Sequence, residues 1–158
     1  MGPEYFMTQA MLEGRKAKDI CGDNPPVGCV LVSGQEIIAK GHTGRPGEPH
    51  AEAMALAKLG QCESPVSAYV TLEPCSFHGR TPSCAKALVK SGIKTVFIGL
   101  IDPDPRNNGK GLKILEDAGI KVHVGVLATE IERDLSPHLA ARTWHTGVGS
   151  ETCLSLPE

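Results

Sequence analysis

The stretch LEPCSFHGRTPSC, residues 72 to 84, places two cysteines on either side of eight intervening residues. The run SAYVTL, residues 67 to 72, leads into it and is short and apolar, which is typical of a buried strand. Residues 84 to 91 have helix-forming character, and Gly92 supplies a C-terminal stop. The pattern therefore predicts Cys75 at the carboxyl end of a strand and Cys84 at the start of a helix.

A histidine and a glutamate stand upstream, in PHAEAMALAKLG, residues 49 to 60. The proline and the strong helix formers predict a helix with His50 in its first turn. His50 and Glu52 are two residues apart, so at a helix start both can border one pocket while doing different work. One imidazole and two thiols make a three-ligand set. Zinc held by three protein ligands keeps a fourth position for water, which distinguishes a catalytic site from a closed structural one.

Two other interpretations of the cysteines remain open at this point. A structural zinc would need a fourth ligand, and His78 inside the loop is the candidate, although Glu52 would then have no role. A disulfide framework is disfavoured, because the six cysteines show no regular spacing and we expect a reducing compartment. We expect the remaining four to be ordinary thiols: Cys21, Cys29, Cys62 and Cys153.

Composition narrows the classes of function. The chain has 158 residues, of which 41% are hydrophobic and 22% charged, as expected for one globular domain. The formal net charge is −2 and no Lys or Arg cluster stands out, which argues against nucleic-acid binding as a function. No run approaches the roughly 18 apolar residues of a membrane span, and the N-terminal residues do not resemble a signal peptide. We expect a cytoplasmic protein.

Hydrophobic periodicity predicts alternating strands and helices. Helices between strands imply right-handed crossovers and parallel pairing, so we expect an α/β fold with one mixed sheet and helices on both faces. We expect strands at residues 27–32, 36–41, 67–72, 95–100 and 121–126, and helices at residues 5–18, 49–60, 84–91, 111–119 and 128–142. Residues 1–146 form one predicted domain, and residues 147–158 a frayed tail.

The candidate metal motif resembles that of zinc-dependent deaminases. His50-Ala51-Glu52 and Pro74-Cys75 match their H-x-E and P-C signatures, although eight residues replace the usual two before Cys84. With that long gap, the chain resembles the deaminase domain of the bacterial riboflavin-biosynthesis deaminase/reductase family. The likeness runs from about residue 5 to residue 135 and includes three further stretches: NPPVGCVLV (24 to 32), GHTGRPGEPHAEAMAL (41 to 56) and GLIDPDPRNNGKGLKILEDAGI (99 to 120).

This resemblance implies a fold and a reaction. The fold is a cytidine deaminase-like three-layer α/β/α sandwich whose five-stranded mixed sheet has its last two strands parallel. The reaction is hydrolytic removal of the 2-amino group of a ribosylaminopyrimidinone 5'-phosphate, with release of ammonia. Zn²⁺ would be held by His50, Cys75 and Cys84, and Glu52 would carry protons without binding the metal.

The resemblance also implies substrate contacts. Asn24 and His42 occupy family positions near the pyrimidine and the ribose, and Arg80 stands where the family more often has lysine. Asp102 and Asp104 lie in DPDP, where the family usually reads DPNP, so Asp104 replaces a neutral amide by a carboxylate. For Asp102, a turn or capping role is an equal alternative.

Several alternatives and further expectations accompany this hypothesis. The rival activities are deamination of guanine or cytosine, of a pyrimidine in a specialised pathway, or of tRNA adenosine. Deaminases of tRNA adenosine usually show a two-residue gap between the cysteines and a basic surface, and this sequence has neither. A non-enzymatic alternative is a zinc-stabilised interaction module in which Glu52 is dispensable. We find no G-x-G-x-x-G fingerprint and expect no NADPH chemistry. By resemblance, we expect a homo-oligomer, either a dimer or a tetramer.

Overall fold

One five-stranded sheet organises the chain. The computed structural model describes residues 2–62, 64–77 and 82–145, with side chains up to residue 139. The strand order is β2-β1-β3-β4-β5. Strand β1 pairs antiparallel with both β2 and β3, whereas β3, β4 and β5 run parallel, so the predicted parallel pairing of the last two strands is confirmed. The strands are β1 Gly28–Ser33, β2 Glu36–His42, β3 Val66–Leu72, β4 Thr95–Leu100 and β5 Lys121–Val124.

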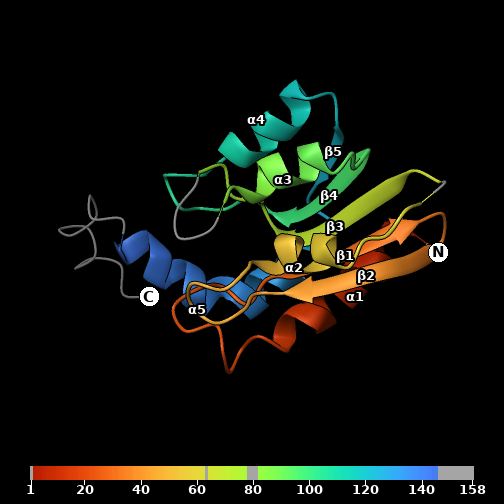
Figure 1. Cartoon of the computed structure of the whole chain (residues 1–158). Helices are drawn as coiled ribbons and strands as arrows, with labels where there is room; N and C mark the ends of the chain where they lie inside the picture. The colour runs from red at the N-terminus through yellow and green to blue at the C-terminus, as the bar shows by residue number, and fades with distance from the viewer. Residues whose placement is uncertain (1, 63, 78–81, 146–158) are drawn as a thin grey trace.

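Helices cover both faces of this sheet and complete the three predicted layers (Figure 1). Helices α1, Pro3–Arg15, and α5, Ala128–His145, lie on one face. Helices α2, Ala51–Ala57, α3, Cys84–Lys90, and α4, Lys110–Asp117, lie on the other. Because crossovers between parallel strands are right-handed, the helices that connect β3, β4 and β5 fall on the same face.

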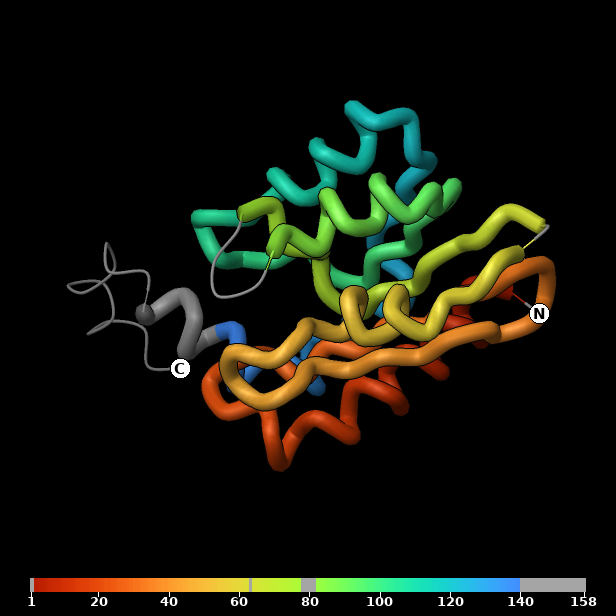
Figure 2. The backbone as a smooth tube through the Cα atoms, in the orientation of Figure 1, coloured from red at the N-terminus to blue at the C-terminus, as the bar shows by residue number. Residues whose placement is uncertain are grey.

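Parallel pairing also places the loops that follow β3 and β4 at the same end of the sheet. The carboxyl ends of β3 and β4 meet at one edge of the sheet, where α/β proteins usually place their sites. In Figure 2 the loop after β4 runs beside the segment after β3, and a backbone hydrogen bond from Glu73 N to Leu100 O joins the two strand ends at 2.9 Å. Residues 73–77 of the cysteine segment thus lie next to the DPDP loop.

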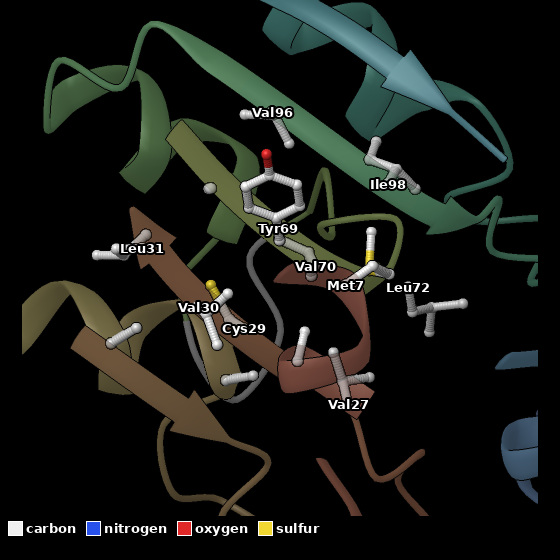
Figure 3. Packing of buried hydrophobic residues seen from close by; sticks show 14 of the residues in the cluster. Met7, Val27, Cys29, Val30, Leu31, Tyr69, Val70, Leu72, Val96 and Ile98 are labelled. Carbon is white, nitrogen blue, oxygen red and sulfur yellow. The ribbon is translucent and has the colours of Figure 1, made fainter. Parts of the chain in front are cut away.

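The hydrophobic core cluster includes residues from helices on both faces of the sheet, and Figure 3 shows the part of it in which Met7 of α1 lies near residues of β1 and β3. Its largest fully buried side chains include Phe6 and Met7 from α1, Leu31 from β1 and Ile98 from β4. Three of the four cysteines expected to be ordinary thiols are described and are free, namely Cys21, Cys29 and Cys62, and Cys29 is completely buried in β1. Cys153 and the predicted tail lie outside the described residues. Among the described helices, none combines the length and hydropathy required to cross a bilayer.

Gly41 allows α2 to lie directly on β2. A Cβ atom at this position would collide with the backbone carbonyl of Ala51, at the first turn of α2. The absence of a side chain thus sets how closely that turn approaches the sheet. Helix α2 begins at Ala51, so His50 is its N-cap residue, one position before the predicted first turn.

Candidate metal centre and active site

Three side chains from separate elements converge on one point. His50 is the N-cap of α2, Cys75 follows β3, and Cys84 is the first residue of α3. His50 Nδ1 lies 3.5 Å from Cys84 Sγ and 3.9 Å from Cys75 Sγ. The three candidate ligand atoms all lie within 4.8 Å of one another. The sequence predicted this set, and the fold brings it together across 34 residues of chain.

The spacing suits a tetrahedral zinc ion. With Zn–S bonds of about 2.3 Å and Zn–N bonds of about 2.1 Å, tetrahedral geometry separates the donor atoms by about 3.5 to 3.8 Å. The observed sulfur-to-nitrogen distances, 3.5 and 3.9 Å, lie close to this range. Two thiols and an imidazole are also ligands that zinc prefers. The residues present therefore fit the metal.

The environment favours a negative sulfur. The pKa of the Cys75 thiol falls to about 4, mainly because the Cys84 thiol donates a hydrogen bond to the Cys75 sulfur. Interactions of this sulfur with His50 and with the backbone amide of Cys84 lower the pKa further. That amide lies 3.2 Å from Cys75 Sγ. The same shared proton raises the pKa of the Cys84 thiol. A coordinating divalent ion deprotonates thiols outright, so both sulfurs would be thiolates in a loaded site.

Glu52 is buried beside this cluster. It lies in the first turn of α2 and is only 3% exposed. Burial raises the pKa of its carboxyl to about 7, and the negative charge of Cys75 acts in the same direction. The neighbouring thiol of Cys29 has its pKa raised by burial and by Glu52, so it stays protonated. A carboxyl group with a pKa near neutrality can both accept and donate a proton under physiological conditions.

Ser83 joins the two cysteine segments. Its hydroxyl donates to the carbonyl of Cys75 at 2.8 Å and accepts from the backbone amide of Lys86 at 3.2 Å, which caps α3. The amide of Ala85 donates to the same Cys75 carbonyl at 3.0 Å. Ser83 was not predicted from the sequence, although a serine directly before a helix start is a recognisable capping signal.

The two aspartates of DPDP are buried within their own loop. Asp102 is 1% exposed, and its Oδ1 accepts from the amide of Asp104. Asp104 is completely buried and accepts three side-chain hydrogen bonds from Arg106, the shortest 2.6 Å from Nη2. The Arg106 guanidinium also lies 4.9 Å from the centre of the Phe77 ring. Asp104, the carboxylate that departs from the family pattern, is thus paired with the Arg106 cation two residues later in the chain. Direct substrate contact by either aspartate stays a prediction.

The other predicted substrate residues lie on neighbouring segments. His42 ends β2, and its Nδ1 lies 2.8 Å from Glu13 Oε2. Asn24 lies between α1 and β1, on a segment that Thr43 ties to the end of β2 through hydrogen bonds with Val27 N and the carbonyl of residue 25. The fourth-ligand candidate His78 and the predicted substrate residue Arg80 lie outside the described residues.

Glu13 is a buried carboxylate that the sequence did not single out. Burial alone would raise its pKa, but hydrogen bonds with His42 and Lys16 outweigh burial and hold the pKa below the ordinary 4.5. A lowered folded-state pKa means that Glu13 contributes stability above pH 4.5, and that this contribution is lost as the pH falls through the lowered value. The contact thus links α1 to the end of β2 in a pH-dependent manner.

We expect Glu13→Gln to lower the free energy of unfolding at pH 7 by about 1 kcal/mol, or about 2 to 4 °C in Tm. The difference from the unsubstituted protein should shrink between pH 5 and pH 3, because acid protonates the native carboxylate as well. Thermal melts across this range measure it, with the exposed Glu132→Gln as the matched control. A difference that stays constant down to pH 3 would contradict the role assigned to this carboxylate.

The candidate ligands and Glu52 lie within a region that matches a known protein family. The family model "Cytidine and deoxycytidylate deaminase zinc-binding region" matches residues 2–100, a range that includes the histidine, the glutamate and both cysteines. The chain is 44% identical over 133 residues to "Riboflavin biosynthesis protein RibD" of Escherichia coli. That alignment covers 84% of this chain and 36% of the relative, so the chain spans about a third of that longer protein.

Two further relatives extend the likeness. The chain is 38% identical to "Diaminohydroxyphosphoribosylamino-pyrimidine deaminase" of Buchnera aphidicola, with 84% of this chain and 90% of that protein aligned. Among solved structures, Acinetobacter baumannii RibD superposes with a TM-score of 0.85 at 40% identity, over 89% of this chain and 40% of the other. The predicted cytidine deaminase-like fold is confirmed by these matches.

Proposed function

The chain belongs to the zinc-dependent cytidine and deoxycytidylate deaminase family, in its riboflavin-biosynthesis branch, and from this premise we propose that it is an aminohydrolase of an aminopyrimidine nucleotide. The substrate is a ribosylaminopyrimidinone 5'-phosphate, which loses its 2-amino group as ammonia. The observation that carries the proposal is the buried Glu52 carboxyl beside the cluster of His50, Cys75 and Cys84.

The residues divide the reaction between them. His50, Cys75 and Cys84 hold the zinc ion, which when bound supplies Lewis acidity and lowers the pKa of a water molecule toward neutrality. Glu52 takes a proton from the attacking water and passes it to the ring nitrogen. The water oxygen bonds to the ring carbon in this step, and Glu52 then transfers the proton of the new hydroxyl to the amino group, so that the C–N bond breaks, ammonia leaves and a ring carbonyl remains. A pKa near 7 suits Glu52 to both directions of transfer.

Other residues serve substrate binding in this proposal. Asn24 and His42 contact the pyrimidine and the ribose, and Arg80 contacts a phosphate or ring carbonyl. The hydrogen bond between His42 and Glu13 supports a fixed orientation of the imidazole. Cytoplasmic location and assembly into a dimer or tetramer stay predictions, the second of which light scattering on the purified protein tests.

A panel of substrates tests the proposal. The purified protein is incubated in turn with the riboflavin-pathway pyrimidine phosphate, guanine and cytosine, and ammonia is measured. We expect kcat/KM for the pyrimidine phosphate to exceed the others by at least about 100-fold, because a site built for polar substrate groups is left with unpaired partners by analogues that lack them. Ammonia from a free base alone would overturn the substrate while leaving the chemistry. No ammonia from any compound by the zinc-loaded protein would favour the interaction module.

A further inference from the structure

Glu73 is a buried carboxylate that the proposed chemistry does not use. It stands between the last residue of β3 and the Pro74-Cys75 pair, and it is 3% exposed. Its carboxylate accepts three backbone hydrogen bonds from another part of the chain. Oε1 accepts from the amides of Asp102 at 3.1 Å and Gly109 at 3.0 Å, and Oε2 accepts from the amide of Leu112 at 2.9 Å.

Through the bonds from Gly109 and Leu112, the Glu73 side chain caps the N-terminus of α4. Gly109 is the N-cap residue of that helix and has a positive φ of 83°, and no side chain of its own caps the helix start. The first amides of a helix have no partner within the helix, and a negative charge is stabilising near them. The carboxylate therefore closes the end of α4 from the neighbouring strand, 36 and 39 residues away in the chain.

A second side chain ties the same loop to both neighbours of Cys75. Asn107 is completely buried, its Oδ1 accepts from the amide of Ser76 at 3.0 Å, and its Nδ2 donates to the carbonyl of Pro74 at 3.2 Å. Gly111 completes the contact, because a Cβ atom there would collide with that Pro74 carbonyl. The start of α4 is thus fastened to the segment that presents the Cys75 sulfur.

We propose that Glu73 is a positioning residue for the metal ligand Cys75, and that it acts by anchoring the start of α4 against residues 74 to 76. The inference rests on the proposed zinc site and adds a residue to it. A ligand whose backbone is already held needs less ordering when the metal binds, so its supporting contacts contribute to metal affinity. Glu73 itself touches neither the ion nor the substrate.

The test is Glu73→Gln, which keeps the shape of the side chain but turns an amide NH₂ group toward a backbone donor. We expect the dissociation constant for zinc to rise by about 10- to 100-fold, measured by competition with a chromophoric chelator. The cobalt-substituted protein should show altered visible bands, because those bands report the geometry of the thiolate ligands. Glu116→Gln, on the exposed side of α4, is the matched control and should change neither value.

A second variant keeps the inference testable if Glu73→Gln does not fold. Asn107→Ala leaves the helix cap in place but removes the contacts with Pro74 and Ser76, and it should also weaken zinc binding. Unchanged zinc affinity and an unchanged cobalt spectrum in Glu73→Gln, with only a lower melting temperature, would overturn the inference. If both variants accumulate only as insoluble protein, the residues are required by the fold and the inference again fails. Failure of the unsubstituted protein to bind zinc would instead contradict the proposed function.

Discussion

Glu52→Gln is expected to lower kcat for ammonia release by about 10²- to 10⁴-fold while the protein still binds one zinc ion per chain. Glutamine has nearly the shape of glutamate but cannot take up or deliver a proton. The melting temperature should be at least as high as that of the unsubstituted protein. The burial that raises the pKa of the Glu52 carboxyl to about 7 also makes its charged form unfavourable in the fold, and glutamine removes that charge.

The measurements separate proton transfer from metal binding. Steady-state assays give kcat and KM, elemental analysis gives zinc content, and Glu116→Gln again serves as an exposed control that should keep full activity. Activity within about twofold of the unsubstituted protein would show that the proton carrier was assigned to the wrong residue. Loss of activity together with loss of zinc would show that Glu52 acts on the metal.

Cys84→Ser is expected to abolish stable zinc binding and to reduce deamination below about one thousandth of the original rate, because the activated water depends on the metal. The melting temperature should also fall, since the free energy of metal binding contributes to folding. Cys84 is 2% exposed and supplies both a candidate ligand and the amide that donates to Cys75 Sγ. Serine keeps that amide, so the variant isolates the sulfur.

The control for this variant is Cys62→Ser, which changes an exposed thiol in the loop before β3. It should retain zinc, activity and melting temperature. Elemental analysis and the ammonia assay are performed on both variants in parallel. One tightly bound zinc ion in Cys84→Ser, or activity near the original rate, would contradict the assignment of Cys84 as a ligand.

Much of the site could be predicted from sequence because its signals are local. The spacing of His50 and Glu52, and the positions of Cys75 after a strand and Cys84 before a helix, depend on chemical type and on the periodicity of short segments. The alternation of strands and helices likewise predicted the parallel half of the sheet, since handed crossovers leave few topologies. The observed α2 begins two residues later and ends three residues earlier than predicted, which matters little for which side chains reach the site.

Other features depended on which segments pack together. The sequence predicted substrate contact for Asp104, which stays a prediction, but it did not predict the hydrogen bonds that Asp104 accepts from Arg106 in the fold. Glu13 and His42 meet across 29 residues, and Glu73 and Leu112 across 39.

The sequence by itself therefore determined the candidate ligand set, the candidate proton carrier and the order of the elements, because these follow from residue chemistry and from backbone geometry over a few residues. Only the tertiary structure decided which buried carboxylate accepts hydrogen bonds from which distant amide. A buried polar group must find a partner wherever packing places one, and no spacing along the chain specifies that place.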